Sequence, residues 1–242
     1  DEPTSVLAAR AAERALDAAE MKAEELDVII VGTLTPDRLM PNTACYVQRR
    51  LGAPAGAMCF DLEAACSGFL YGLEVASNLI RCGGHRNALV IGAEKLSSMT
   101  DWTDRSTCVL FGDGAGAMVL REAEPENDAF LASRLGADGH YTDLLHIPAG
   151  GSALPSTHDT LEKKLNFIKM TGREVFKLAV GAMVRSAQEV LDETGLDVEQ
   201  IRWLVPHQAN TRIIKAVGKR LGFAEEKVYI NLDRYGNTSA AT

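Results

Sequence analysis

Three short polar clusters each follow a predicted strand and open a predicted helix. Their sequences are AACSG at 64–68, PHQAN at 206–210 and YGNTS at 235–239. Because ligands of α/β proteins gather at the carboxyl ends of strands, these clusters are the first candidates for chemistry. Their reactive members are a thiol, an imidazole and a carboxamide, from Cys66, His207 and Asn237.

Cys66 lies where a strand turns sharply through small residues into an apolar helix, as in a nucleophile elbow. Unpaired amides at a helix N-terminus favour a thiolate, which would attack a carbonyl or thioester. The alternative is a small buried hydrophobic residue, the usual state of a free cysteine. The other four cysteines (Cys45, Cys59, Cys82 and Cys108) lack this context and are predicted to lie in the core.

His207 follows Pro206 at the end of a predicted strand and could exchange a proton near neutral pH. The amide of Asn237 could donate to an oxyanion without titrating. Taken singly, a surface histidine and a helix-capping asparagine explain these residues equally well. The four remaining histidines have no metal-ligand spacing, so we expect no metal.

Strands and helices alternate along the chain, which predicts an α/β fold with mostly parallel sheets. We expect a division at 124/125, within the acidic stretch EAEPEND. The predicted helices cover 4–20 (capped by Thr4 or Ser5), 42–51, 68–82, 171–194 and 208–221, and the predicted strands cover 27–32, 57–62, 87–93, 114–121, 129–135, 201–205 and 227–231, with a long loop at 137–160. The run FGDGAG at 111–116 predicts a tight turn entering a strand, since its spacing fits no phosphate loop.

The composition of the chain excludes several classes of protein. The 242 residues carry a net charge of −8, which disfavours a general nucleic-acid binder, and no apolar run approaches a membrane span. Five cysteines without a CxxC pair argue against a disulfide framework and favour a reducing, cytoplasmic location.

Three motifs in order resemble one family. AACSGF at 64–69, VPHQAN at 205–210 and GNTSAA at 236–241, with DRSTCVLFGDGAGAMVL at 104–120, are similar to β-ketoacyl-acyl-carrier-protein synthase III of the thiolase superfamily. The resemblance implies a homodimer and a thiolase-like fold, in which two similar α/β halves form an α/β/α/β/α arrangement. The halves would be 1–124, with the nucleophile, and 125–242. We expect the terminal segments of the family, with their strands, to be missing from this chain.

The resemblance also implies a mechanism. Cys66 would take an acyl group from acetyl-CoA or another short acyl-CoA. His207 and Asn237 would then stabilise the enolate formed by decarboxylation of malonyl-acyl-carrier protein, and this enolate would attack the acyl group. The reaction initiates type II fatty acid synthesis and requires no cofactor.

The family's binding sites map onto further residues. CoA and the acyl tunnel are expected at Arg105, Arg173, Phe176, Ala209 and Asn210, with Met40 at a partner subunit's acyl pocket. The helix at 208–221 has a basic face opposite an apolar one, which would suit an acidic carrier protein or be an ordinary solvated face. The family's carrier-docking positions are Lys177, Arg212, Lys219 and Arg220.

Two alternatives stay open. A related acyltransferase of secondary metabolism could use the same Cys-His-Asn triad. A truncated, non-catalytic subunit could bind acyl-CoA on the same fold.

Overall fold

The computed structural model describes residues 2–242, and its contacts divide the chain into two compact units. The first unit holds the chain up to Lys95, Asp113–Ser133 and Thr238–Thr242, and the second holds Leu96–Gly112 and Arg134–Asn237. This grouping differs from the predicted division at 124/125, because residues 96–112 join the second unit and the last five residues join the first. The chain therefore passes between the units repeatedly.

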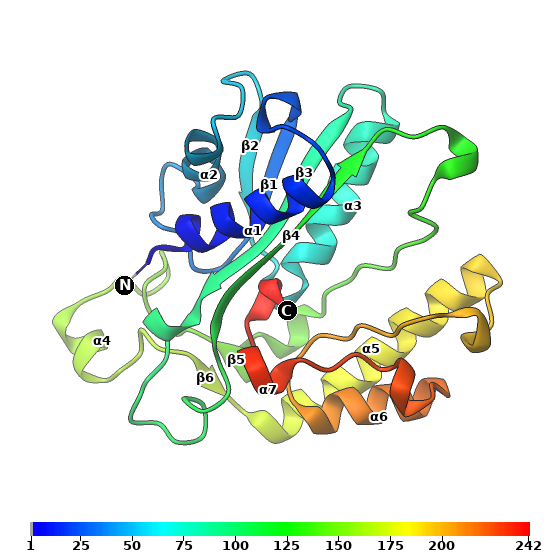
Figure 1. Ribbon diagram of the computed structural model, residues 1–242. Helices are drawn as coiled ribbons and strands as arrows, with labels where there is room; N and C mark the ends of the chain where they lie inside the picture. The colour runs from blue at the N-terminus through cyan, green and yellow to red at the C-terminus, as the bar shows by residue number, and fades with distance from the viewer. Residues whose placement is uncertain (1) are drawn as a thin grey trace. The chain divides into compact units, whose positions relative to one another are not determined.

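The first unit is built on a four-stranded mixed sheet (Figure 1). The strand order is β2-β1-β3-β4; β1 is parallel to both β2 and β3, and β4 is antiparallel to β3. The strands are β1 (Val28–Gly32), β2 (Met58–Leu62), β3 (Asn87–Lys95) and β4 (Asp113–Arg121), and the helices are α1 (Thr4–Ala18), α2 (Thr43–Leu51) and α3 (Gly68–Arg81). All seven correspond to predicted elements.

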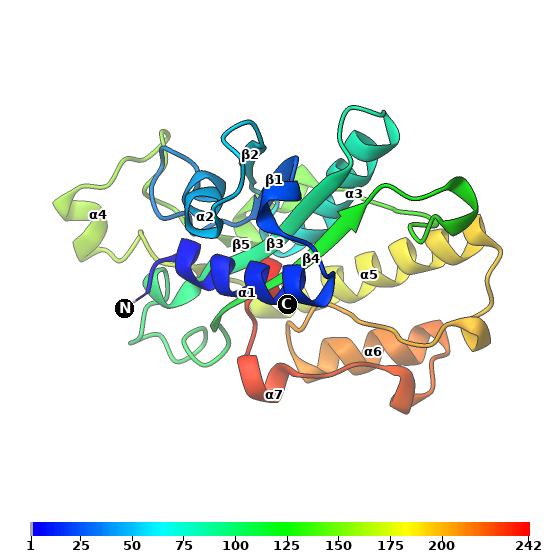
Figure 2. The same ribbon diagram turned by 45° about the horizontal axis from the view of Figure 1, so that its top comes forward.

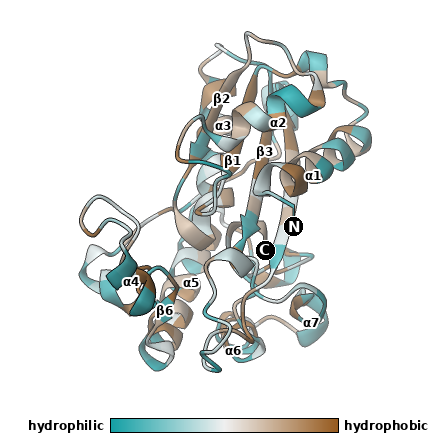
Figure 3. Ribbon diagram, turned by 90° about the vertical axis from the view of Figure 1, so that its left-hand side faces the viewer, coloured by the Kyte–Doolittle hydropathy of each residue, from teal (hydrophilic) through white to brown (hydrophobic). Residues whose placement is uncertain are grey.

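Helices cover both faces of this sheet, so its central strands are apolar throughout rather than alternating. Ile29 of β1 and Leu89 of β3 pack with residues of α1 and α2, whereas Val28 and Val90 pack with residues of α3. β1 is fully buried, and the strands are drawn largely in brown in Figure 3. The core of this unit thus fixes the ends of its strands.

The start of α1 corrects a predicted cap. Its N-cap is Pro3, which makes no side-chain cap bond. The hydroxyl of Thr4 donates instead to the carbonyl oxygen of Thr35 at 2.5 Å, and Ser5 bonds to the carboxylate of Asp37 through both its backbone N–H and its hydroxyl. These side chains tie the helix to the loop after β1 rather than closing its first turn.

The second unit is mainly helical. Its longer helices, α5 (Gly172–Thr194) and α6 (Thr211–Leu221), lie side by side (Figure 2) and share an apolar cluster that includes Val180, Ile213 and Val217. The shorter elements are α4 (His158–Glu162), α7 (Leu232–Tyr235) and the two-residue strands β5 (Leu145–His146) and β6 (Lys169–Met170).

Three predicted strands do not form ladders in this structure. Residues 129–135 are irregular, and segments 201–205 and 227–231 share a single bridge between Leu204 and Val228. That bridge is held by two hydrogen bonds, from Leu204 N to Lys227 O and from Tyr229 N to Leu204 O. A strand needs a ladder on at least one side, and one bridging pair does not supply it. The predicted long loop at 137–160 also contains β5 and the start of α4.

Candidate active site

Cys66 lies on a strained turn between β2 and α3, as predicted. Residues Ala65–Ser67 form a 3-10 turn, and α3 starts at Gly68. Ala65 has φ +43°, a left-handed conformation that is costly for a residue with a Cβ. Its N–H donates to the Glu63 carboxylate at 2.9 Å. The turn therefore presents Cys66 at the N-terminus of a 14-residue helix.

A close backbone approach fixes this turn against the sheet. A Cβ placed on Gly32, at the end of β1, would lie 2.8 Å from the carbonyl carbon of Gly68. Only glycine allows β1 and α3 to approach so closely. The position of Cys66 is thus set by the buried sheet and not by the loop alone.

Burial raises the pKa of the Cys66 thiol, and this effect outweighs the others. The negative charge of Glu94 raises the pKa further. Burial of the thiol therefore opposes the thiolate that the helix N-terminus and the backbone hydrogen bond at Cys66 favour.

The other cysteines differ from one another. Cys45, Cys59 and Cys108 are half-buried, but Cys82 is exposed, so its predicted core position is wrong. Cys82 is the C-cap residue of α3 and lies at the solvent-exposed end of that helix. Burial raises the pKa of Cys59 to about 11, which makes that thiol a poor nucleophile.

His207 lies in an irregular segment of the second unit. Burial alone lowers its pKa to about 4, so the imidazole is neutral near pH 7. Its Nδ1 atom is buried and has no hydrogen-bond partner among the described residues. A neutral imidazole can donate one hydrogen bond without bringing a positive charge.

Gln208 holds the segment that carries His207. Its side-chain amide donates to Pro206 O at 2.8 Å and to Tyr229 O at 3.2 Å, and its Oε1 accepts from Asn231 N at 2.9 Å. Gln208 is 2% exposed, so these bonds are shielded from water. Gln208 was not among the residues predicted from the sequence, because a glutamine beside a candidate histidine carries no signal of its own.

Asn237 is buried beside the turn that precedes β4. Its N–H donates to Leu110 O and its carbonyl accepts from Gly112 N, both at 2.9 Å. Gly236 before it has φ +68°, and a Cβ there would lie 3.2 Å from Leu110 O. The FGDG turn, predicted to lead into a strand, does so at Asp113 and also anchors the backbone of Asn237.

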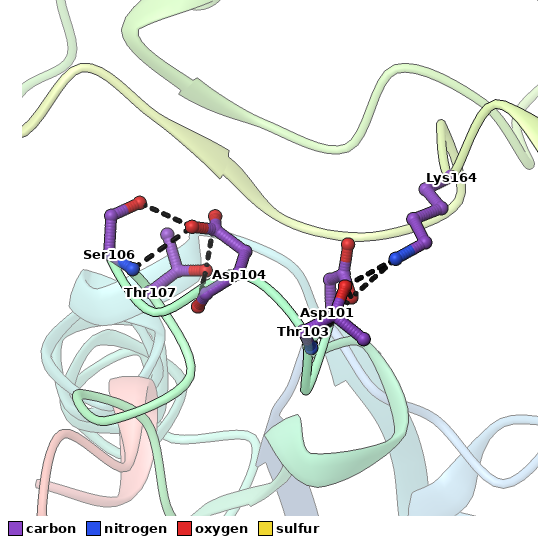
Figure 4. A network of polar contacts seen from close by, with 6 residues as sticks. All are labelled: Asp101, Thr103, Asp104, Ser106, Thr107 and Lys164. Atoms are coloured by element: carbon purple, nitrogen blue, oxygen red, sulfur yellow. Dashed lines mark hydrogen bonds and ion pairs between the residues drawn. The ribbon is translucent and has the colours of Figure 1, made fainter.

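Arg105 is exposed on a loop of the second unit, where we expected a CoA contact. The loop around it is pinned by two carboxylates (Figure 4). Asp104 accepts from the hydroxyls of Ser106 and Thr107 at 2.6 and 2.8 Å. Asp101 accepts from Thr103 at 2.7 Å and from Lys164 Nζ at 3.2 Å, and the hydrogen bonds from Thr103 are the main cause of its low pKa of about 2.

The other residues predicted to contact CoA or the acyl chain differ in how deeply they are buried. Phe176 and Ala209 are half-buried and pack against the apolar cluster shared by α5 and α6, and their place in an acyl tunnel stays a prediction. Asn210 caps α6, and its Oδ1 accepts from Ile213 N at 2.9 Å, which leaves its NH₂ group to donate to a ligand. Arg173 is exposed on the first turn of α5. Met40 belongs to the first unit and is 81% exposed.

α6 has the predicted two faces. Ile213, Ile214, Val217 and Leu221 are buried. The exposed basic side chains of this helix are Arg212, Lys215, Lys219 and Arg220, and Lys177 is likewise exposed on α5.

Residues 2–242 contain neither a metal-ligand cluster nor a membrane-spanning helix. No group of three or more His, Cys, Asp or Glu side chains in this part of the chain could hold a metal ion. No helix among the same residues is long and apolar enough to cross a membrane.

Comparison with known proteins identifies the family. Two models match, for 3-oxoacyl-[acyl-carrier-protein] synthase III at residues 60–139 and for its C-terminal part at 191–242. A beta-ketoacyl-[acyl-carrier-protein] synthase III from Caldanaerobacter subterraneus is 55% identical over 99% of this chain and 72% of its own length. The chain belongs to the β-ketoacyl-acyl-carrier-protein synthase III family. It is an acyltransferase of the condensing-enzyme class.

Solved structures of the family confirm the fold. The 3-oxoacyl-[acyl-carrier-protein] synthase III of Aquifex aeolicus is 46% identical with a TM-score of 0.89, over 100% of this chain and 73% of that one. The priming β-ketosynthase of the R1128 polyketide pathway is 35% identical with a TM-score of 0.86, over 100% and 71%. The predicted thiolase-like α/β fold class is correct.

The catalytic triad itself stays a prediction. Cys66 belongs to the first unit, whereas His207 and Asn237 belong to the second. Two further buried polar residues, Glu94 and Ser239, were missed by the sequence analysis. Glu94 did carry a signal, a carboxylate directly after the apolar run NALVIGA, but the predicted strand ended one residue before it.

Proposed function

We propose that Cys66 is the acyl acceptor of a decarboxylative condensation that starts fatty acid synthesis. The observation that carries this proposal is the strained turn that places Cys66 between the half-buried parallel strand β2 and a long helix. Family membership supplies the reaction class. The Cys66 thiolate attacks the thioester of acetyl-CoA or another short acyl-CoA, and CoA leaves as its thiolate.

His207 and Asn237 serve the second half-reaction in this proposal. Malonyl-acyl-carrier protein loses CO₂, and the electron pair of the broken bond forms an enolate at the thioester. The neutral imidazole of His207 and the amide of Asn237 donate hydrogen bonds to that oxyanion. The enolate carbon then attacks the acyl carbon on Cys66, which expels the Cys66 thiolate. The low pKa of His207 supports a donor role, since a neutral ring keeps its proton during the reaction.

The substrates and assembly are part of the same proposal. Arg105, Arg173 and Asn210 contact CoA, with the acyl chain near Phe176 and Ala209. Lys177, Arg212, Lys219 and Arg220 dock the acidic carrier protein, since charge complementarity favours such an encounter. The protein works as a cytoplasmic homodimer in which Met40 reaches the partner's acyl site. No metal or redox cofactor is needed, because CO₂ loss drives the bond formation.

Intact-protein mass spectrometry after incubation with acetyl-CoA tests this function. We expect one acetyl adduct in the unaltered protein and none in Cys66→Ser. Cys82→Ser is the matched control, since Cys82 is the exposed cysteine, and it should keep the adduct. An adduct that survives in Cys66→Ser and disappears in Cys82→Ser would remove Cys66 from the reaction.

A second candidate is the priming of a polyketide, which the 35% identity to a priming β-ketosynthase supports less strongly than the 55% identity supports the first. A panel of longer and branched acyl-CoAs separates the two by the preferred primer. Binding of CoA without any adduct would favour the non-catalytic alternative.

A further inference from the structure

Lys164 forms a polar cluster with two residues of the 101–107 loop (Figure 4). Its Nζ atom donates to the Asp101 carboxylate at 3.2 Å and also to the Thr103 hydroxyl. The Thr103 hydroxyl in turn donates to the same Asp101 oxygen at 2.7 Å. Each of the three side chains therefore bonds to the other two. All three residues belong to the second unit.

The backbone of Lys164 has a conformation that lysine rarely adopts. The residue follows the C-cap of α4, and its φ of +54° is the left-handed conformation in which glycine usually ends a helix. Leu165 N–H donates to Thr160 O at 2.9 Å, which closes this turn. Strain of this kind gathers at functional sites. Glycine at position 164 would remove the strain, but it would also remove the ammonium group.

The loop that Lys164 reaches is held mainly by its own turns. Asp104, for example, accepts from the hydroxyls of Ser106 and Thr107. Among the described residues, Lys164 is the one residue outside 96–110 that hydrogen-bonds to any of residues 100–107. Asp101 is 8% exposed, which shields its bonds from water. The position of the loop within the second unit therefore depends on Lys164.

Two exposed side chains on this loop have groups that bind nucleotides. Arg105 is exposed, and Trp102 is 64% exposed while its indole N–H donates to Ser97 O at 3.3 Å. A guanidinium group binds phosphate, and an indole ring can stack on a nucleic base. CoA contains both phosphate groups and a purine base. The chemistry of the loop therefore agrees with the CoA contact proposed for Arg105.

We infer that Lys164 is a positioning residue for CoA binding. It ties the turn at Asp101 to the end of α4 and thereby holds Arg105 in the place where this side chain meets CoA. Lys164 itself makes no contact with CoA, and its role rests on the one proposed for Arg105. A loop without this tie must be ordered when CoA binds, and that ordering reduces the affinity. Ground-state and transition-state binding weaken equally, so KM rises and kcat does not change.

Calorimetric titration of the protein with CoA tests this role. We expect Lys164→Met, which keeps the length of the side chain, to raise the Kd for CoA about three- to tenfold. Lys163→Met is the matched control, because it removes the same charge from the adjacent residue, whose ammonium group pairs with Asp159 on the surface. Its Kd should not change. Equal rises in both variants would show that positive charge alone attracts CoA, and would overturn the inference.

Two further substitutions of Lys164 separate positioning from folding. Lys164→Gly relieves the left-handed strain, which offsets the lost bonds, so resistance to urea should change little while the Kd for CoA rises as in Lys164→Met. Lys164→Arg keeps donors for Asp101 and Thr103 and should restore the Kd to within about twofold of the unaltered protein. An unaltered Kd in Lys164→Gly, or no recovery in a folded Lys164→Arg, would contradict the positioning role.

A double-mutant cycle shows whether Lys164 acts through Arg105. Arg105→Ala should weaken CoA binding, and adding Lys164→Met to that variant should weaken it no further. Additive losses would mean that Lys164 meets CoA independently of Arg105, which would make it a ligand-binding residue and overturn the positioning role.

The order of the loop can be followed without any ligand. In a Trp203→Phe background Trp102 is the sole tryptophan. Lys164→Met should lower its fluorescence anisotropy, whereas Lys163→Met should not, and equal anisotropy in the two would overturn the inference. CoA binding requires no acyl transfer, so a protein that binds CoA but forms no acetyl adduct would count against the proposed function alone. A normal adduct with an unchanged Kd in Lys164→Met would count against this inference alone.

Discussion

The two units hold their candidate active-site residues in different ways. In the first unit, Cys66 stands at the end of a ladder in which five residues of β1 pair with both neighbouring strands. In the second unit, the segments around His207 share one bridge, between Leu204 and Val228. The nucleophile is thus positioned by a buried sheet, and the hydrogen-bond donors by a few side-chain and backbone contacts such as those of Gln208.

This difference predicts which kinds of substitution would impair each of the two proposed half-reactions. In the proposed reaction, acyl transfer to Cys66 depends on the geometry of a rigid core, which responds to packing changes as a whole. The proposed oxyanion stabilisation depends on single donors, His207 and Asn237, that can be removed one at a time. Substitutions in the two units should therefore have effects of different kinds as well as of different sizes.

The largest expected effect is on decarboxylation. Removing one oxyanion donor costs about 10²- to 10³-fold in rate, so His207→Ala and Asn237→Ala should slow CO₂ release from malonyl-acyl-carrier protein by that factor. Acetylation of Cys66, measured on the same samples by intact mass, should fall less than about tenfold. Equal losses in both half-reactions would mean that the two residues serve the nucleophile as much as the enolate.

Replacing one glycine in each unit by alanine tests how rigidly each unit is packed. Gly92→Ala would place a methyl group 2.0 Å from Ala240 O, where neither backbone can move freely. We expect it to lower the free energy of unfolding by about 3 kcal/mol, measured by urea denaturation.

Gly181→Ala in α5 is the matched control for this change. Its Cβ would meet only the end of the flexible Arg185 side chain at 3.4 Å, and alanine is the better helix former. Stability should stay the same or rise by up to about 1 kcal/mol. A tolerated Gly92→Ala would show that the sheet yields more than its packing indicates.

The same contrast explains what the sequence could predict. The elements of the first unit were predictable because burial on both faces leaves uninterrupted apolar runs such as DVIIVG and NALVIGA. Segments 201–205 and 227–231 (IRWLV and KVYIN) are also rich in residues that favour strands but lack a ladder, because pairing is a property of the neighbours rather than of the segment. Cys66, His207 and Asn237 were found by their place after strands, whereas Gln208 acts through long-range contacts that no local pattern records.

One titratable group in each unit, His207 in the second and Glu94 in the first, makes the stability of the protein depend on pH. The pKa of His207 is about 4 in the folded chain, below its ordinary value of 6.5. Between these values the unfolded chain binds a proton that the folded chain does not, so stability falls as the pH falls. Glu94 has the opposite effect, because its pKa in the folded chain is raised above its ordinary value of 4.5. Its contribution to stability is fully present below pH 4.5 and is lost as the pH rises through the raised pKa of the folded chain.

Chemical denaturation at pH 7 and pH 4.5 isolates the histidine. We expect the unaltered protein to lose about 2 to 3 kcal/mol more than His207→Gln between these two values. The contribution of Glu94 is common to both proteins and cancels. Identical losses would mean that His207 is accessible to protons in the folded state, which would also weaken its role as a neutral donor.

The smallest expected effect concerns the surface of the second unit. Arg212 lies on the exposed basic face of α6, opposite the buried Ile213 and Val217. Arg212→Glu should raise the KM for malonyl-acyl-carrier protein about five- to tenfold, because charge reversal on a docking face slows the encounter. The KM for acetyl-CoA should not change. The difference in the KM for malonyl-acyl-carrier protein between Arg212→Glu and the unaltered protein should shrink in high salt, which screens charges.

Arg202→Glu makes the same change of charge at another exposed position of the second unit and should leave both KM values unaltered. An equal rise of KM in Arg202→Glu would indicate that net charge, and not the face of α6, attracts the carrier protein. A rise in both substrates' KM for Arg212→Glu alone would indicate that the helix shifts as a whole. Because α6 begins at the Asn210 cap, two residues after Gln208, such a shift would also disturb His207 and link the docking surface to the donors.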